Sequence, residues 1–186
     1  GTQFVPVGTL EAMLHGTLGN RVERPGGAEV YSPGFFALRG QYPGERWIDI
    51  ELATQTLVVY EGEKPIFATL VSTGRGAQGT EQATPKGVHR IWVKLRSTNM
   101  SNLSDEDAQH YYAIEDVPFV QFFHKGVGLH AAFWHRAFGY ERSQGCVNLA
   151  PLDAQKLFEL TSPRLPAGWH AVLPTAVEEG TVIRVR

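Results

Sequence analysis

Hydrophobic and polar residues alternate along much of the chain after residue 46, which is the pattern of β-strands. Residues 47–53 alternate aliphatic side chains with Asp49 and Glu51, so they are predicted to form a half-buried strand. Residues 56–74 hold two β-branched runs on either side of EGEK, the pattern of a hairpin. Further strands are expected at 87–95, at two or three places within 110–132, at 168–174 and at 180–186.

One segment has the features of a helix. Residues 151–160 begin with proline, which suits the first position of a helix, and the segment carries an apolar stripe formed by Leu152, Leu157, Phe158 and Leu160. Many strands with one clear helix predict a mainly β fold, a sandwich or barrel with one or two short helices.

The first part of the chain differs in composition from the rest. Residues 1–46 are rich in Pro-Gly, Gly-Gly and Ser-Pro-Gly, with a possible short helix at 7–16. We expect an N-terminal extension over a main domain at 47–186, or the remnant of a preceding module. Polar loops are expected at 75–87 and 96–109, where binding sites often lie.

Composition narrows the function only slightly. The 186 residues are 42% hydrophobic and 19% charged, with a net charge of −2, as in an ordinary globular domain. Nucleic acid is therefore not an expected partner, and no apolar run is long enough to span a membrane. The chain begins without methionine, so we expect a signal peptide or anchor to have been removed.

The single cysteine, Cys146, is the main candidate for chemistry. A catalytic cysteine needs a nearby base, usually a histidine, and His130 ends a predicted strand upstream. Gly145 leaves the adjacent backbone open, so that its N–H groups can face an oxyanion. Spacing alone leaves the alternative of a buried, inert thiol open, because free cysteines are often packed.

Two other site types fit the sequence poorly. His124, His130 and His135 are spaced by six and five residues, which matches no helical pair of zinc ligands. The Gly-rich segment 72–80 lacks the lysine of a phosphate-binding loop. No metal or cofactor is therefore expected.

The segment 129–149, LHAAFWHRAFGYERSQGCVNL, resembles the signature of the L,D-transpeptidase (YkuD-type) catalytic domain. That signature has a histidine, a loop of about fifteen residues, then Ser-His-Gly-Cys, an aliphatic residue, and Arg or Asn. The matching positions are His130, Ser143, Gly145, Cys146, Val147 and Asn148. The hairpin ending in Ser-Thr-Gly and the Thr-Pro-x-Gly segment at 84–87 are also similar to the family.

The resemblance implies roles for particular residues. Cys146 would be the nucleophile and His130 its base, oriented by the carbonyl of Ala131. Backbone N–H groups of Gly145 and Cys146 would hold the oxyanion, aided by Gln144, which stands where the family usually has histidine. An amide can donate a hydrogen bond but cannot carry a proton. A cysteine poised beside such a base is expected to have a depressed pKa.

The implied reaction is acyl transfer between peptidoglycan stem peptides, giving 3→3 cross-links in the bacterial cell envelope. Carbapenem-type inhibitors would acylate the same thiol. Substrate contacts are expected from Ser143, Asn148, Arg142, Trp134 and Tyr112. The alternatives are an L,D-carboxypeptidase, a protein-to-peptidoglycan ligase, or an envelope module that binds peptidoglycan and has lost catalysis through Gln144.

Overall fold

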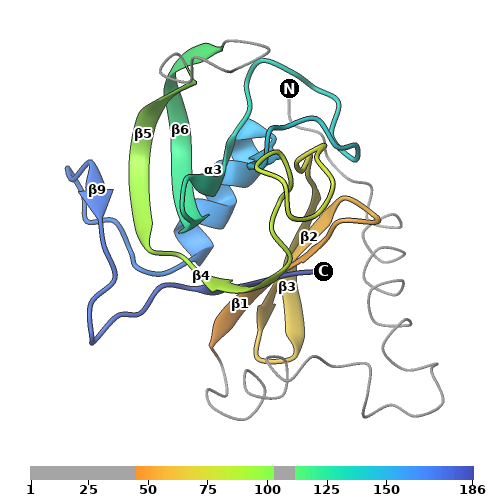
Figure 1. The fold of residues 1–186 in the computed structure, drawn as a ribbon. Helices are drawn as coiled ribbons and strands as arrows, with labels where there is room; N and C mark the ends of the chain where they lie inside the picture. The colour runs from red at the N-terminus through yellow and green to blue at the C-terminus, as the bar shows by residue number, and fades with distance from the viewer. Residues whose placement is uncertain (1–44, 103–111) are drawn as a thin grey trace, which may run out of the picture.

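The computed structural model describes residues 45–102 and 112–186. The possible helix at 7–16 lies outside these residues. The described part is mainly β, as predicted, with two five-stranded sheets and one α-helix (Figure 1). In chain order the elements are β1 (Arg46–Glu51), β2 (Thr56–Glu61), β3 (Lys64–Leu70), β4 (Gly87–Arg90), β5 (Val93–Ser101), β6 (Ala113–His124), β7 (Val127–Ala131), β8 (Val147–Leu149), α3 (Pro151–Leu160), β9 (Ala171–Val172) and β10 (Val182–Val185).

Hairpins build most of both sheets. The first sheet has the order β3-β2-β1-β10-β4, in which β10 pairs in parallel with β1 and antiparallel with β4. The second has the order β8-β7-β6-β5-β9, in which β8 pairs in parallel with β7. The predicted hairpin around EGEK is confirmed as β2 and β3. The parallel β7–β8 pair matters most here, because it brings the two halves of the motif side by side.

The main core contains aliphatic residues of both sheets together with two residues of α3, Ala154 and Leu157. Helix α3 has the predicted bounds and lies beside β6 and β7 (Figure 1). The predicted apolar stripe is wrong at Leu152, which is 54% exposed. Leu152 lies on the side of α3 that faces away from its buried residues, Ala154 and Leu157.

Two strand predictions need correction. The loop expected from residue 96 begins later, because β5 continues to Ser101 and pairs with β6. Strand β1 is not half-buried, since its inner residues are buried on both faces. Asp49 is only 2% exposed because Arg184, its parallel partner on β10, donates to it at 2.7 Å. A paired charge can be buried where an isolated one could not.

A buried lysine holds the end of α3. Lys94 Nζ donates to the carbonyls of Phe158 and Thr161 at 2.6 and 2.9 Å, and to the Thr161 hydroxyl at 3.0 Å. Burial lowers the pKa of Lys94 to about 7, whereas three acceptors at a helix C-terminus favour its ammonium form. This contact ties β5 of the second sheet to the helix that follows the cysteine loop.

Candidate active site

The two halves of the motif meet on neighbouring parallel strands. His130 on β7 is directly opposite Asn148 on β8. Cys146 precedes Asn148 by two positions, so strand alternation turns its side chain to the same face. Leu129 and Val147 point the other way, into the core. The fold therefore brings the predicted nucleophile and the predicted base to one surface.

A cavity of about 210 Å³ opens at this surface. Cys146 and His130 both line it, as do Gln144 and all five predicted substrate contacts. Gly145 does not. The described residues that line it are Arg75, Met100, Tyr112, Ile114, His130, Trp134, Arg142, Ser143, Gln144, Cys146 and Asn148.

The imidazole of His130 is buried and held in one orientation. Its Nδ1 lies 3.1 Å from the carbonyl oxygen of Ala131, the orienting group expected from the resemblance. A carbonyl oxygen only accepts, so Nδ1 donates and Nε2 keeps its lone pair. Burial lowers the pKa of His130 to about 4, with His135 also lowering it and the Ala131 hydrogen bond opposing. The ring is therefore a neutral base across the physiological range.

Two aromatic residues frame the histidine and the cysteine. Trp134 stacks on His130 with ring centroids 5.7 Å apart and remains 41% exposed, so it forms a wall. Tyr112 is 37% exposed, and its backbone N–H donates to the side chain of Asn102 at 2.8 Å. Burial and then the charge of Cys146 raise the pKa of the Tyr112 phenol. The phenol consequently stays protonated and can donate a hydrogen bond.

The thiol of Cys146 corrects one expectation. Burial raises its pKa, and a backbone hydrogen bond from Gly128 only partly opposes this effect. The expected depressed pKa of the Cys146 thiol is therefore wrong. A high thiol pKa beside a histidine pKa of about 4 means that both groups are neutral at pH 7. A resting thiolate–imidazolium pair is therefore not expected, and the Cys146 Sγ lies 3.8 Å from the carbonyl oxygen of Gly126.

This arrangement predicts the acid limb of the pH profile. His130 accepts a proton only when neutral, so kcat/KM for acylation should stay level down to about pH 4 and then fall about tenfold per pH unit. The unfolded chain takes up a proton near pH 6.5, so the fold also loses stability between about pH 6.5 and pH 4. Circular dichroism at each pH separates unfolding from the loss of the base. An acid limb near pH 6.5 would contradict the buried neutral histidine.

The cysteine loop rests on the Ser-Thr-Gly segment that follows β3. Ser72 and Asn148 exchange backbone hydrogen bonds at 3.0 and 2.9 Å, and the carbonyl of Thr73 accepts from the N–H of Ser143 at 3.0 Å. The buried side chain of Gln55 holds Thr73 in turn, with bonds of 2.7 and 2.8 Å. The Ser-Thr-Gly segment that resembles the family therefore holds the cysteine loop in place through backbone hydrogen bonds.

Gly145 has a different role from the one expected. Its φ of +119° is rarely adopted by other residues, and a Cβ there would lie 3.1 Å from the carbonyl oxygen of Glu81. Its N–H donates to the hydroxyl of Ser143 at 3.1 Å, so this group is already engaged. Thr84 Oγ1 donates to the Gly145 carbonyl at 2.7 Å. Gly145 therefore shapes the loop, and the Cys146 N–H remains as the candidate oxyanion donor.

The sequence analysis missed three residues that line the cavity. Arg75 follows the Ser-Thr-Gly segment, and its N–H donates to the carbonyl of Ser143 at 3.1 Å. Its position directly after a family-like motif was a usable signal. Met100 and Ile114 reach the cavity from paired positions on β5 and β6, and only the strand register reveals this.

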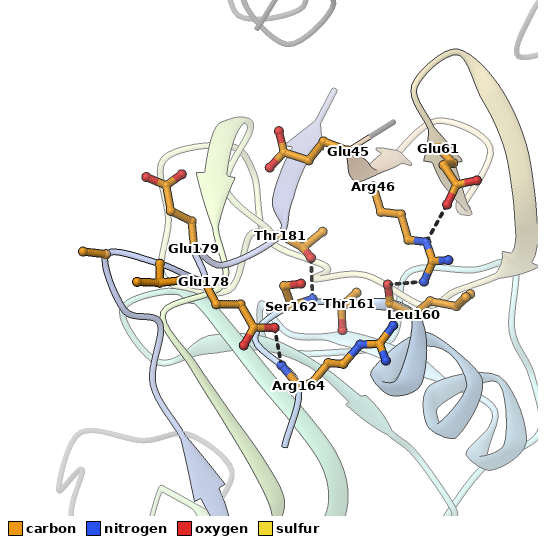
Figure 2. Close-up of a pocket in the computed structure, with 12 residues that line it drawn as sticks. Glu45, Arg46, Glu61, Leu160, Thr161, Ser162, Arg164, Glu178, Glu179 and Thr181 are labelled. Carbon is orange, nitrogen blue, oxygen red and sulfur yellow. Dashed lines mark hydrogen bonds and ion pairs between the residues drawn. The ribbon is translucent and has the colours of Figure 1, made fainter. Parts of the chain in front are cut away.

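A second cavity of about 610 Å³ lies at the C-terminal end of α3 (Figure 2). Half of the described residues that line it are glutamates and arginines, including the Arg46–Glu61 ion pair at 3.1 Å, and none of the described lining residues is a cysteine or histidine. Size alone would favour this cavity, but its described lining offers no thiol and no histidine base. Among the described residues no cluster of histidine, cysteine and carboxylate side chains could hold a metal ion. Nor does the described part of the chain include a helix long and apolar enough to cross a membrane.

Comparisons with solved structures give the same fold. A structure of an L,D-transpeptidase in complex with imipenem is 20% identical, with a TM-score of 0.59, and the match covers 76% of this chain and 58% of that one. L,D-transpeptidase 3 from Mycobacterium tuberculosis, in complex with a faropenem-derived adduct, is 21% identical with a TM-score of 0.57 and coverages of 76% and 60%. This chain thus spans less than two thirds of the length of either protein.

The catalytic domain of the E. faecium L,D-transpeptidase is matched over its full length. The identity is 23% and the TM-score 0.56, and the match covers 79% of this chain and 100% of that domain. At these identities the likeness shows the fold alone. No curated protein matches the chain. The family model of the YkuD L,D-transpeptidase catalytic domain matches residues 45–185, so the chain belongs to this acyltransferase family.

Proposed function

We propose that the protein is a peptidoglycan L,D-transpeptidase that works through a thioester on Cys146. The observation that carries this proposal is the shared cavity of Cys146 and His130, with Nε2 of His130 left as an acceptor by the Ala131 hydrogen bond. Family membership supplies the reaction class. The cavity supports the proposal because it brings a thiol and a neutral base to one face of the β7–β8 pair.

In the first step His130 Nε2 takes the thiol proton while Sγ attacks the carbonyl carbon of the third stem residue. The amide bond to the terminal D-alanine breaks, and the proton on Nε2 passes to the leaving amine. The product is a thioester on Cys146 and free D-alanine. This division into two transfers is the general logic of covalent catalysis.

The tetrahedral oxyanion needs hydrogen-bond donors within the cavity. The N–H of Cys146 lies next to the attacking sulfur. The phenol of Tyr112 is protonated, and the charge of Cys146 contributes to raising its pKa. Gln144 lines the same cavity and can add its amide N–H. These donors replace the Gly145 N–H that was first expected to serve, and none of them has to titrate. Gln144 is therefore compatible with catalysis.

In the second step an amine of a neighbouring stem attacks the thioester. His130 takes a proton from the attacking amine, the C–S bond breaks, a 3→3 amide forms, and His130 passes that proton to the thiolate. Water as acceptor would instead give L,D-carboxypeptidase activity, and a protein amine would give a protein-to-peptidoglycan ligase. These substrates place the enzyme in the bacterial cell envelope. The family match begins at residue 45, which supports assigning catalysis to 47–186 and treating 1–46 as an extension.

The charge of the cavity supports a donor that carries carboxylates. Among the described residues, Arg75 and Arg142 line it and no Asp or Glu does. Guanidinium groups suit carboxylates because they can donate two parallel hydrogen bonds. A stem tetrapeptide has a free carboxylate on the residue that leaves, one residue beyond the bond to be broken.

Product analysis tests the proposal. We expect disaccharide-tetrapeptide incubated with the protein to yield a cross-linked dimer that has lost one D-alanine, resolved by liquid chromatography and mass spectrometry. Tripeptide without dimer would show that water is the acceptor. Unchanged tetrapeptide, under conditions where the protein still binds peptidoglycan, would contradict the proposal and favour a non-catalytic envelope module.

A further inference from the structure

The hydroxyl of Thr84 connects two backbone segments next to the nucleophile. It accepts from the N–H of Gly74 at 2.9 Å and donates to the carbonyl oxygen of Gly145 at 2.7 Å. The direction of both bonds is fixed, because a backbone N–H only donates and a carbonyl oxygen only accepts. Thr84 is 1% exposed and does not line the cavity that holds Cys146. Any effect of Thr84 on the reaction therefore passes through the cysteine loop.

The surroundings of Thr84 keep its hydroxyl in one place against the cysteine loop. A Cβ on Gly74 would lie 2.9 Å from the Cα of Gly145, so a larger residue would push these segments apart. Pro85 follows Thr84 and restricts its backbone to extended conformations. The side-chain amide of Gln78 donates to the carbonyl of Thr84 at 3.1 Å. Both sides of the contact are therefore built for close approach.

The bond from Thr84 sets the orientation of the peptide plane between Gly145 and Cys146. In a planar trans peptide the C=O and the N–H point in opposite directions, so the Cys146 N–H points away from Thr84. This N–H has no hydrogen-bond partner among the described residues. The carbonyl of Cys146 is engaged, because it accepts from the hydroxyl of Ser143. The N–H is thus left open, in a residue that lines the cavity.

We propose that Thr84 is a positioning residue that holds the Gly145–Cys146 peptide plane so that the Cys146 N–H faces the oxyanion formed in the cavity. The proposal rests on the proposed function for the reaction that forms this oxyanion. Gly145 makes such an anchor necessary, because it has a φ of +119° and no Cβ to restrain its backbone. Without Thr84 the peptide plane could rotate and turn its carbonyl, which repels an oxyanion, toward the cavity.

Matched threonine variants test this role in the rate of acylation by a carbapenem, followed by stopped-flow absorbance. Thr84→Val removes the hydroxyl and keeps the shape of the side chain. We expect it to lower the maximal rate about tenfold and to leave the half-saturating concentration unchanged, because an oxyanion donor acts mainly in the transition state. Thr84→Ser keeps the hydroxyl and should restore most of the rate.

Thr181→Val is the control for a lost buried hydroxyl. Thr181 is 3% exposed, its hydroxyl accepts from the N–H of Ser162 at 2.7 Å, and it lines the second cavity. We expect Thr181→Val and Thr84→Val to lower the urea midpoint similarly, because each leaves a buried N–H without its acceptor. Only Thr84→Val should slow acylation. Equal rate losses in the two variants, or no recovery in Thr84→Ser, would overturn the proposal.

Infrared spectroscopy of the completed carbapenem adduct observes the hydrogen bond directly. A bond from the Cys146 N–H weakens the C=O bond of the thioester and lowers its stretching frequency. The frequency should therefore rise in Thr84→Val, return to the wild-type value in Thr84→Ser and stay unchanged in Thr181→Val. A purely structural role for Thr84 would lower stability and leave this frequency unchanged in all three variants, which would contradict the proposal.

Crystal structures of the resting wild-type and Thr84→Val proteins test the geometry without a substrate. We expect the wild-type Cys146 N–H to point into the cavity and the peptide plane to rotate or to take two orientations in Thr84→Val. A wild-type N–H that points away from the cavity, or the same peptide plane in both proteins, would overturn the proposal. Absence of any adduct on the wild-type protein would instead count against the proposed function, and the two structures would still decide the role of Thr84.

Discussion

Replacing Cys146 with alanine is expected to lower acyl transfer by at least about 10³-fold and to abolish covalent modification by a carbapenem. The reason is that the sulfur forms the bond that carries the acyl group between the two steps. Cys146 is the only cysteine in the chain, so no second thiol can substitute for it. Intact-protein mass spectrometry after incubation with carbapenem and with tetrapeptide measures the adduct directly.

Matched variants separate chemistry from folding. His130→Gln should retain the thiol and the fold yet form the adduct far more slowly, because the amide cannot take up the proton. Leu173→Ala, at a residue that is 61% exposed, should form it at the normal rate. An adduct of equal mass and rate in Cys146→Ala would mean that another residue is the nucleophile.

Replacing Asp49 with alanine should be the most damaging of these changes to stability, with an expected loss of about 3–5 kcal/mol in the free energy of unfolding. Asp49 accepts from Arg184 at 2.7 Å and from Arg186 at 3.2 Å, and its side chain is almost completely buried. Its removal leaves the Arg184 guanidinium, itself 8% exposed, without its buried counter-charge. Urea unfolding followed by circular dichroism measures the change.

An exposed ion pair provides the control. Glu61→Gln removes the partner of Arg46 from a pair whose side chains are 34% and 45% exposed, and it should cost less than about 1 kcal/mol. Asp49→Leu combined with Arg184→Met should recover much of the loss, because two apolar side chains leave no buried charge. Equal losses in the free energy of unfolding for the Asp49 and Glu61 variants would show that the buried ion pair contributes no more to stability than the exposed one.

Local sequence patterns predicted the elements whose partners are close in the chain. The EGEK hairpin and helix α3 were found because a turn, a proline and an apolar period are visible within a few residues. The motif also predicted that Cys146 and His130 lie close together. They line one cavity, because β7 and β8 are adjacent parallel strands.

The remaining features depend on contacts between distant parts of the chain. Asp49 read as a solvent-facing residue because its partner Arg184 lies at the other end of the domain. The contact between His135 and Asn148 was not predicted, since nothing in the spacing of these two residues indicates it. The raised pKa of Cys146 comes from burial, which no local pattern reports. In each case tertiary packing, not residue type, decides the chemistry.

The place of β10 in the first sheet affects how the domain can fold during synthesis. Strand β10 separates β1 from β4, so these two strands have no shared edge until residues 182–185 arrive. The ribosome must therefore release nearly the whole domain before its first sheet can close. Pairings so distant in sequence form slowly. The hairpins β2–β3 and β5–β6 are therefore expected to form before the first sheet closes.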